Sequence, residues 1–66
     1  MHHGNVKWFD VGRGIGSIEP EDGEDILVEI SALHRSGIDH LEEGQLVVYD
    51  LEWRRGRPMA EDLKIL

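Results

Sequence analysis

Glycines interrupt this chain so often that no long helix fits between them. Eight of the 66 residues are glycine, and the apolar runs between them are short and lack a helical period. Glycine weakens helix and strand interiors and favours turns, so the pattern predicts short strands joined by tight turns. Five runs are predicted as strands, at residues 5–10, 15–19, 26–30, 45–53 and 59–65. Short strands at this spacing are typical of a small all-β barrel or sandwich.

The run 45–53 has the clearest strand alternation. Val47, Tyr49, Leu51 and Trp53 fall on one face, which is predicted to point inward. Trp53 is therefore expected to cap one end of the barrel rather than to serve as a stacking platform. The longest gap between strands, residues 31–44, is predicted to hold a short helical turn at 31–33 and then a loop.

Size and composition exclude several classes of protein. A 66-residue chain without cysteine forms one domain at most, with neither disulfides nor thiolate zinc sites. No apolar run is long enough to span a membrane, no signal peptide is visible and cysteine is absent, so we expect a cytoplasmic protein without membrane association. We also expect it to be a monomer. No motif around the serines would build a catalytic triad, so neither enzymatic activity nor catalytic residues are expected.

The first three residues, Met1-His2-His3, allow two interpretations. A free amino terminus with histidine in third position can chelate square-planar Cu(II) or Ni(II). A cloning remnant or an ordinary frayed terminus is the simpler interpretation, so no metal site and no cofactor are assigned. The domain is accordingly expected to cover residues 4–66.

Several motifs along the chain resemble those of the bacterial cold-shock proteins. Residues 4–9 read Gly-Asn-Val-Lys-Trp-Phe, where the family has Gly-x-Val-Lys-Trp-Phe. Residues 13–18 and 25–32 stand where the family has its two ribonucleoprotein motifs, and residues 41–45 match as Leu-Glu-Glu-Gly-Gln. The resemblance runs from Gly4 to Leu66. It implies a five-stranded antiparallel barrel of the oligonucleotide-binding (OB) fold, acting as a binding module for single-stranded RNA or DNA.

The resemblance also implies a set of nucleic-acid contacts at matching or bordering positions. These are Lys7, Trp8, Phe9, Arg13, Asp25, Arg54, Arg55 and Arg57. The last three belong to the loop between the final two strands, which borders the nucleic-acid surface in the family. A basic rim around Trp8 and Phe9 is one interpretation of this loop, and a solvated, arginine-rich turn is the other.

Six positions that are commonly aromatic in the family, histidine included, carry other residues here. They are Ile15, Ser17, Leu27, Glu29, Ile30 and Ile38. Stacking of one base on an aromatic ring contributes about 1–3 kcal/mol, so the loss of these rings implies a deficit on the order of 5 kcal/mol. Glu29 also repels phosphates, and the net charge of the chain is −7. We therefore expect strongly weakened single-strand binding, with a Kd of about 0.1 mM or weaker.

The same substitutions suggest an alternative function. An aliphatic face beside Trp8 and Phe9 resembles a docking surface for a protein partner. A further alternative is drift, in which the face has lost its ligand and the domain merely stays folded. Binding that falls steeply with salt would indicate phosphate contacts, whereas association that survives about 0.5 M salt would indicate an apolar interface.

Overall fold

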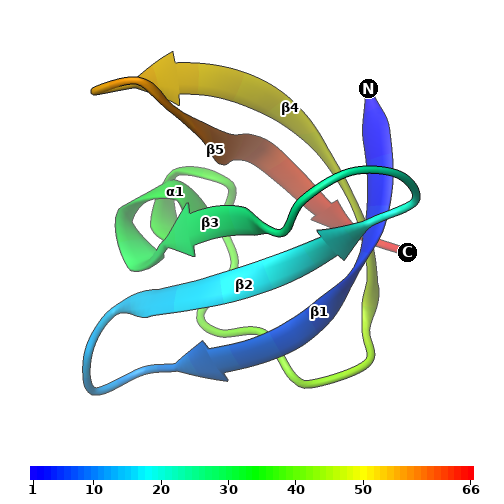
Figure 1. Ribbon diagram of the computed structural model, residues 1–66. Helices are drawn as coiled ribbons and strands as arrows, with labels where there is room; N and C mark the ends of the chain where they lie inside the picture. The colour runs from blue at the N-terminus through cyan, green and yellow to red at the C-terminus, as the bar shows by residue number, and fades with distance from the viewer.

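The computed structural model describes residues 1–66 and has a closed barrel of five strands (Figure 1). The elements are β1 (His2–Asp10), β2 (Ile15–Pro20), β3 (Ile26–Glu29), α1 (Ile30–Arg35), β4 (Leu46–Arg54) and β5 (Arg57–Ile65). Their order around the barrel is β1-β2-β3-β5-β4. Neighbouring strands are antiparallel except β3 and β5, which meet in a short parallel contact at Leu27 and Met59. The predicted all-β, five-stranded OB-type barrel is confirmed.

One apolar core fills the barrel. Its eleven buried residues are Val6, Ile18, Ile26, Val28, Ala32, Leu33, Leu41, Val47, Tyr49, Ala60 and Leu63. The helix α1 is longer than the helical turn expected at 31–33, and it contributes Ala32 and Leu33 to this core. Ser36 ties the end of α1 to β5, because its hydroxyl accepts a hydrogen bond of 3.0 Å from the backbone N–H of Leu63. No helical segment is long and apolar enough to cross a membrane.

Strand β1 begins three residues earlier than the sequence indicates. His2 pairs with Tyr49 and His3 with Val48 on β4, so the sheet includes both histidines. The ring of His2 also stacks on the ring of Tyr49, with centroids 5.7 Å apart. Backbone pairing with β4 therefore extends β1 to His2 and His3, although the local sequence there has no strand pattern.

The expectation that Trp53 caps the barrel is wrong. Trp53 is 71% exposed, more than any other aromatic residue of the chain. The end of β4 pairs only with the start of β5, as Trp53 lies opposite Pro58, and this hairpin projects beyond the body of the barrel (Figure 1). Strand alternation predicts the side of β4 on which Trp53 lies. That part of β4 extends past the core, so no core residues are there to bury the ring.

Candidate nucleic-acid interface

Two rows of side chains cross the outward side of β1, β2 and β3. In the first row Trp8 lies opposite Ser17, and Ser17 lies opposite Leu27. In the second row Ile15 lies between Asp10 and Glu29. Residues directly opposite one another in antiparallel strands share a face. We call these six residues the outer face: Trp8, Asp10, Ile15, Ser17, Leu27 and Glu29.

Trp8 is the only aromatic residue on the outer face. It is 41% exposed, whereas Ser17 beside it is only 8% exposed and Leu27 is half-buried. A register shift between Val6 and Trp8 leaves both Lys7 and Trp8 exposed, although consecutive strand residues ordinarily point to opposite faces. The outer face thus offers one ring to a base, followed by a hydroxyl and an aliphatic side chain.

Phe9 lies on the other side of β1, facing the barrel interior. Its register partner is Gly16, which in turn lies opposite the fully buried Val28. A Cβ placed on Gly16 would stand 2.3 Å from Cδ1 of Phe9, so the ring occupies the space that glycine leaves open. Phe9 is half-buried and packs against the core. The structure therefore does not bring Phe9 and Trp8 together on one surface.

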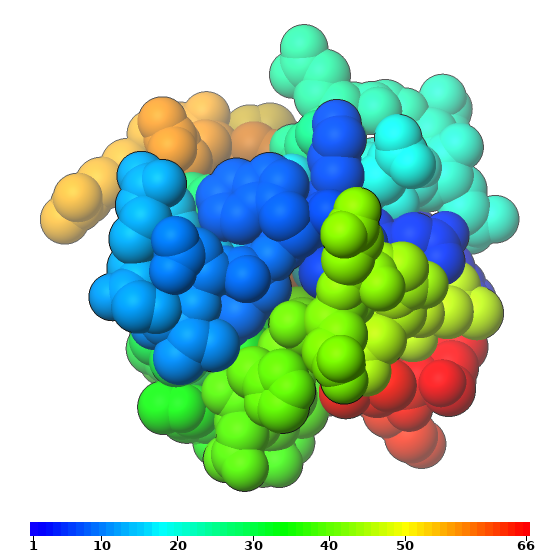
Figure 2. All heavy atoms as spheres, turned by 90° about the horizontal axis from the view of Figure 1, so that it is seen from below, coloured from blue at the N-terminus to red at the C-terminus, as the bar shows by residue number.

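Ile30 and Ile38 lie away from the two rows. Ile30 opens α1, and its backbone N–H donates a 2.9 Å hydrogen bond to the carbonyl of Gly14 in the turn between β1 and β2. Ile38 is half-buried against the core. Figure 2 shows the barrel from below, where the segment after α1 (green) covers its lower end beside the β1–β2 turn (light blue). The aliphatic part of the outer face is consequently limited to Ile15 and Leu27.

The Lys7 ammonium is held by Asp25. The Nζ atom lies 2.8 Å from Oδ2 of Asp25, and both side chains are about half exposed. This hydrogen bond, together with the charge of Asp25, raises the pKa of Lys7 above its usual range. Arg13 is exposed and forms no ion pair, although its backbone N–H donates to the carboxylate of Asp10. Of these two cations, only Arg13 is free of a carboxylate partner.

The three arginines of the β4–β5 hairpin border a groove beside β3. This groove has a volume of about 480 Å³, and we call it the arginine groove. Its lining residues are Leu27, Glu29, Arg54, Arg55, Arg57 and Met59. Leu27 and Met59 are paired in the sheet and supply its apolar side. Arg55 and Arg57 are exposed and form no ion pair, so both guanidinium groups are available to an anion.

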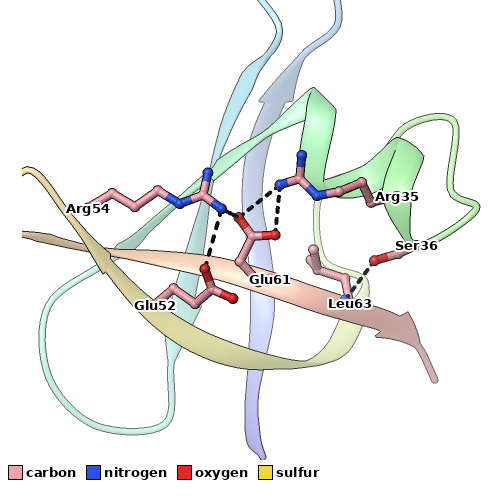
Figure 3. A network of polar contacts seen from close by, with 6 residues as sticks. All are labelled: Arg35, Ser36, Glu52, Arg54, Glu61 and Leu63. Carbon is pink, nitrogen blue, oxygen red and sulfur yellow. Dashed lines mark hydrogen bonds and ion pairs between the residues drawn. The ribbon is translucent and has the colours of Figure 1, made fainter.

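Arg54 belongs to a different set of contacts, shown in Figure 3. Its Nη2 lies 2.9 Å from Oε2 of Glu61 and 3.3 Å from Oε1 of Glu52. From the opposite side, Arg35 of α1 donates hydrogen bonds of 2.8 and 3.0 Å to the two oxygens of Glu61. The hydrogen bonds to Glu61, together with its charge, raise the pKa of Arg35 above its usual range. Only 7% of the Glu61 side chain is exposed.

Glu61 is absent from the residues that the sequence singled out. The available signal was an acid in phase with Met59 and Leu63, the apolar positions of the last strand. A buried acid of this kind requires cationic or donor partners, because an unpaired buried carboxylate is strongly unfavourable. The partners come from α1 and from the end of β4, two segments that no local pattern connects.

Comparison with known proteins gives one consistent result. The family described as "'Cold-shock' DNA-binding domain" matches residues 2–66. The chain is 44% identical over 63 residues to the "Cold shock-like protein CspC" of Bacillus cereus, covering 94% of this chain and 97% of the relative. It is 41% identical over 63 residues to the "Major cold shock protein" of Streptococcus pyogenes, covering 96% and 94%. It is 42% identical over 67 residues to "Cold shock protein CspA" of Rhizobium meliloti, covering 97% of both.

Proposed function

The chain belongs to the cold-shock domain family, a family of nucleic-acid-binding domains and not of enzymes, and we propose that it binds single-stranded RNA or DNA weakly. The binding surface is the outer face together with the arginine groove. Binding of this kind needs no cofactor. The protein acts as a monomer in the cytoplasm.

The row Trp8–Ser17–Leu27 carries the proposal of weak binding. Three positions in register offer one ring between them, and Ser17 is nearly covered. Each base that loses an aromatic partner loses about 1–3 kcal/mol, whereas a micromolar complex has only about 8 kcal/mol in total. A single exposed indole beside aliphatic side chains therefore supports a Kd of about 0.1 mM or weaker.

The charges around the outer face support retained but modest attraction to phosphates. Arg13, Arg55 and Arg57 are free cations, while Lys7 and Arg54 are held by carboxylates. Asp10 and Glu29 lie on the outer face itself and oppose phosphates nearby. Attraction is consequently strongest along the hairpin rather than in a ring around Trp8 and Phe9.

Docking of a protein partner on the same face has less support. The expected apolar surface included Phe9 and Ile38, and both pack against the core instead. The remaining apolar side chains, apart from Trp8, are half-buried. A protein partner is therefore kept as an outcome of the test below, indicated by association that survives about 0.5 M salt.

Restoring the missing rings tests the proposal. A variant with Ile15→Phe, Ser17→Phe, Leu27→Phe and Glu29→His is titrated with a pyrimidine-rich heptanucleotide, and its affinity is compared with that of the unmodified chain. We expect at least a tenfold gain, since each stacked base contributes about 1–3 kcal/mol. Trp53→Phe in both proteins leaves Trp8 as the sole indole reporter.

A matched control places a new ring away from the outer face. Leu46 at the start of β4 is 43% exposed and lies opposite Asn5, so Leu46→Phe adds aromatic surface away from the six residues of the outer face. Its affinity is expected to equal that of the unmodified chain. The proposal fails if the ring-restored variant gains nothing, or if the unmodified chain already binds with submicromolar affinity.

A further inference from the structure

Glu29 places a carboxylate inside the arginine groove. It ends β3, lies opposite Ile15 on the outer face, and is half-buried. The groove volume of about 480 Å³ falls in the range of small-molecule sites, so a single nucleobase has room there. A base resting against the half-buried Leu27 would have its edge near Glu29 and its phosphate near the hairpin arginines.

The oxygens of Glu29 have no partner within the protein. None of the ion pairs includes Glu29, although three arginines line the same groove. No side-chain hydrogen bond engages it either. A carboxylate only accepts hydrogen bonds, so whatever enters the groove and meets Glu29 must offer an N–H or O–H donor.

The bases differ in what they offer at this point. Cytosine, adenine and guanine each carry an exocyclic amino group, and a carboxylate accepts well from an amino group such as N4 of cytosine. Thymine and uracil lack this amino group; their only edge donor is N3–H, which lies between two carbonyl oxygens that a carboxylate repels. Arg55 and Arg57 can donate to the ring acceptors beside the amino group, so the mixture of one acid and free arginines suits an edge with both donor and acceptors.

We infer that the arginine groove selects bases with an exocyclic amino group over uracil and thymine, and that Glu29 makes the selection. The inference rests on the proposed function, because it assumes that a single strand reaches the outer face. It assigns Glu29 a role beyond repulsion, since one carboxylate both lowers affinity for every strand and ranks the bases that still bind.

Two heptanucleotides that differ only at the pyrimidine edge provide the test. Oligodeoxycytidine and oligodeoxyuridine have the same length, ring size and charge, and both are titrated into the isotope-labelled chain while amide chemical shifts are recorded. We expect oligodeoxycytidine to bind at least about fivefold more tightly, the lower end of what one well-placed base contact gives. Glu29→Gln is expected to bring the two affinities within about twofold, because an amide both donates and accepts.

Glu43→Gln is the matched control. It removes the same charge from an exposed position in the loop before β4, so it should raise both affinities equally and keep the preference. Equal binding of the two heptanucleotides by the unmodified chain overturns the selection and leaves weak binding in place. An unchanged preference in Glu29→Gln overturns the assignment to Glu29. Binding of neither heptanucleotide at millimolar concentration overturns the proposed function as well.

Discussion

The guanidinium of Arg54 lies 2.9 Å from a carboxylate oxygen of Glu61, whose side chain is 7% exposed. The Arg54 guanidinium is therefore engaged within the barrel and is not available to a ligand. Its neighbours Arg55 and Arg57 form no ion pair and are exposed. An arginine-rich hairpin thus contains side chains with two different roles, and substitution experiments should separate them.

Glu61→Gln is expected to lower the free energy of unfolding by about 1–2 kcal/mol. The change removes the buried charge that holds Arg35 and Arg54, but both arginines are about half exposed and regain water, which limits the loss. Glu52→Gln is the matched control, because Glu52 is 51% exposed and should contribute less than about 0.5 kcal/mol. Urea denaturation measures both, and equal effects would contradict the assigned role of Glu61.

Gly16→Ala is expected to destabilise the barrel by about 1–3 kcal/mol. The added methyl group would stand 2.3 Å from Cδ1 of Phe9 and 2.8 Å from the backbone oxygen of Trp8, so the ring must leave its place. Gly12→Ala is the control, since its nearest neighbour would be a side-chain oxygen at 3.4 Å. Thermal unfolding of the two variants distinguishes them, and equal stability would contradict the inward placement of Phe9.

The sole tyrosine gives a test in alkaline solution. Burial, with a smaller effect from the carboxylate of Glu21, raises the pKa of Tyr49 above its ordinary value of 10.0. The folded state then holds this proton where the unfolded chain loses it. The stabilisation is complete below pH 10 and is lost as pH rises through the higher, folded-state pKa.

Phenolate absorbance should accordingly appear at higher pH in the folded chain than in the chain unfolded by urea. The Tyr49→Phe variant should lose this part of the alkaline decrease in stability, although the raised pKa of Lys7 contributes a further decrease in both proteins. Identical phenolate titration curves with and without urea would count against burial of the Tyr49 ring in the folded chain.

Arg57→Ala should reduce the salt dependence of nucleic-acid binding. Each phosphate contact to a single strand contributes about 0.7 to the slope of log K against log salt, so the slope should become shallower by about this amount. Lys64→Ala removes a cation from an exposed position near the end of β5 and should leave the slope unchanged. A slope that responds equally to both substitutions would indicate only the net charge of the chain.

The barrel itself follows from local patterns in the sequence. Spaced glycines and alternating runs such as the one containing Val47 and Tyr49 define five strands, and motif resemblance supplies their arrangement. What local patterns miss are effects of neighbouring strands. Pairing with β4 extends β1 back to His2, and the projecting hairpin leaves Trp53 without a core to enter.

The candidate site was less predictable for the same reason. Alternation puts Ser17 and Leu27 on the outer face, but the register shift before Trp8 and the glycine beneath Phe9 are needed to separate these two aromatic residues. The Lys7–Asp25 and Arg54–Glu61 pairs join residues far apart in the sequence. Only the folded structure therefore reveals which basic side chains lack a carboxylate partner.

Amide chemical shifts of the unmodified chain, recorded during titration with a pyrimidine-rich heptanucleotide, report both the affinity and the location of binding. Weak binding at the outer face and the arginine groove predicts fast-exchange shifts that cluster at Trp8, Ser17 and Leu27 and at the hairpin arginines, with a Kd of about 0.1 mM or weaker. Submicromolar affinity would rule out weak binding, and shifts confined to the start of β1 around His2 would rule out the outer face.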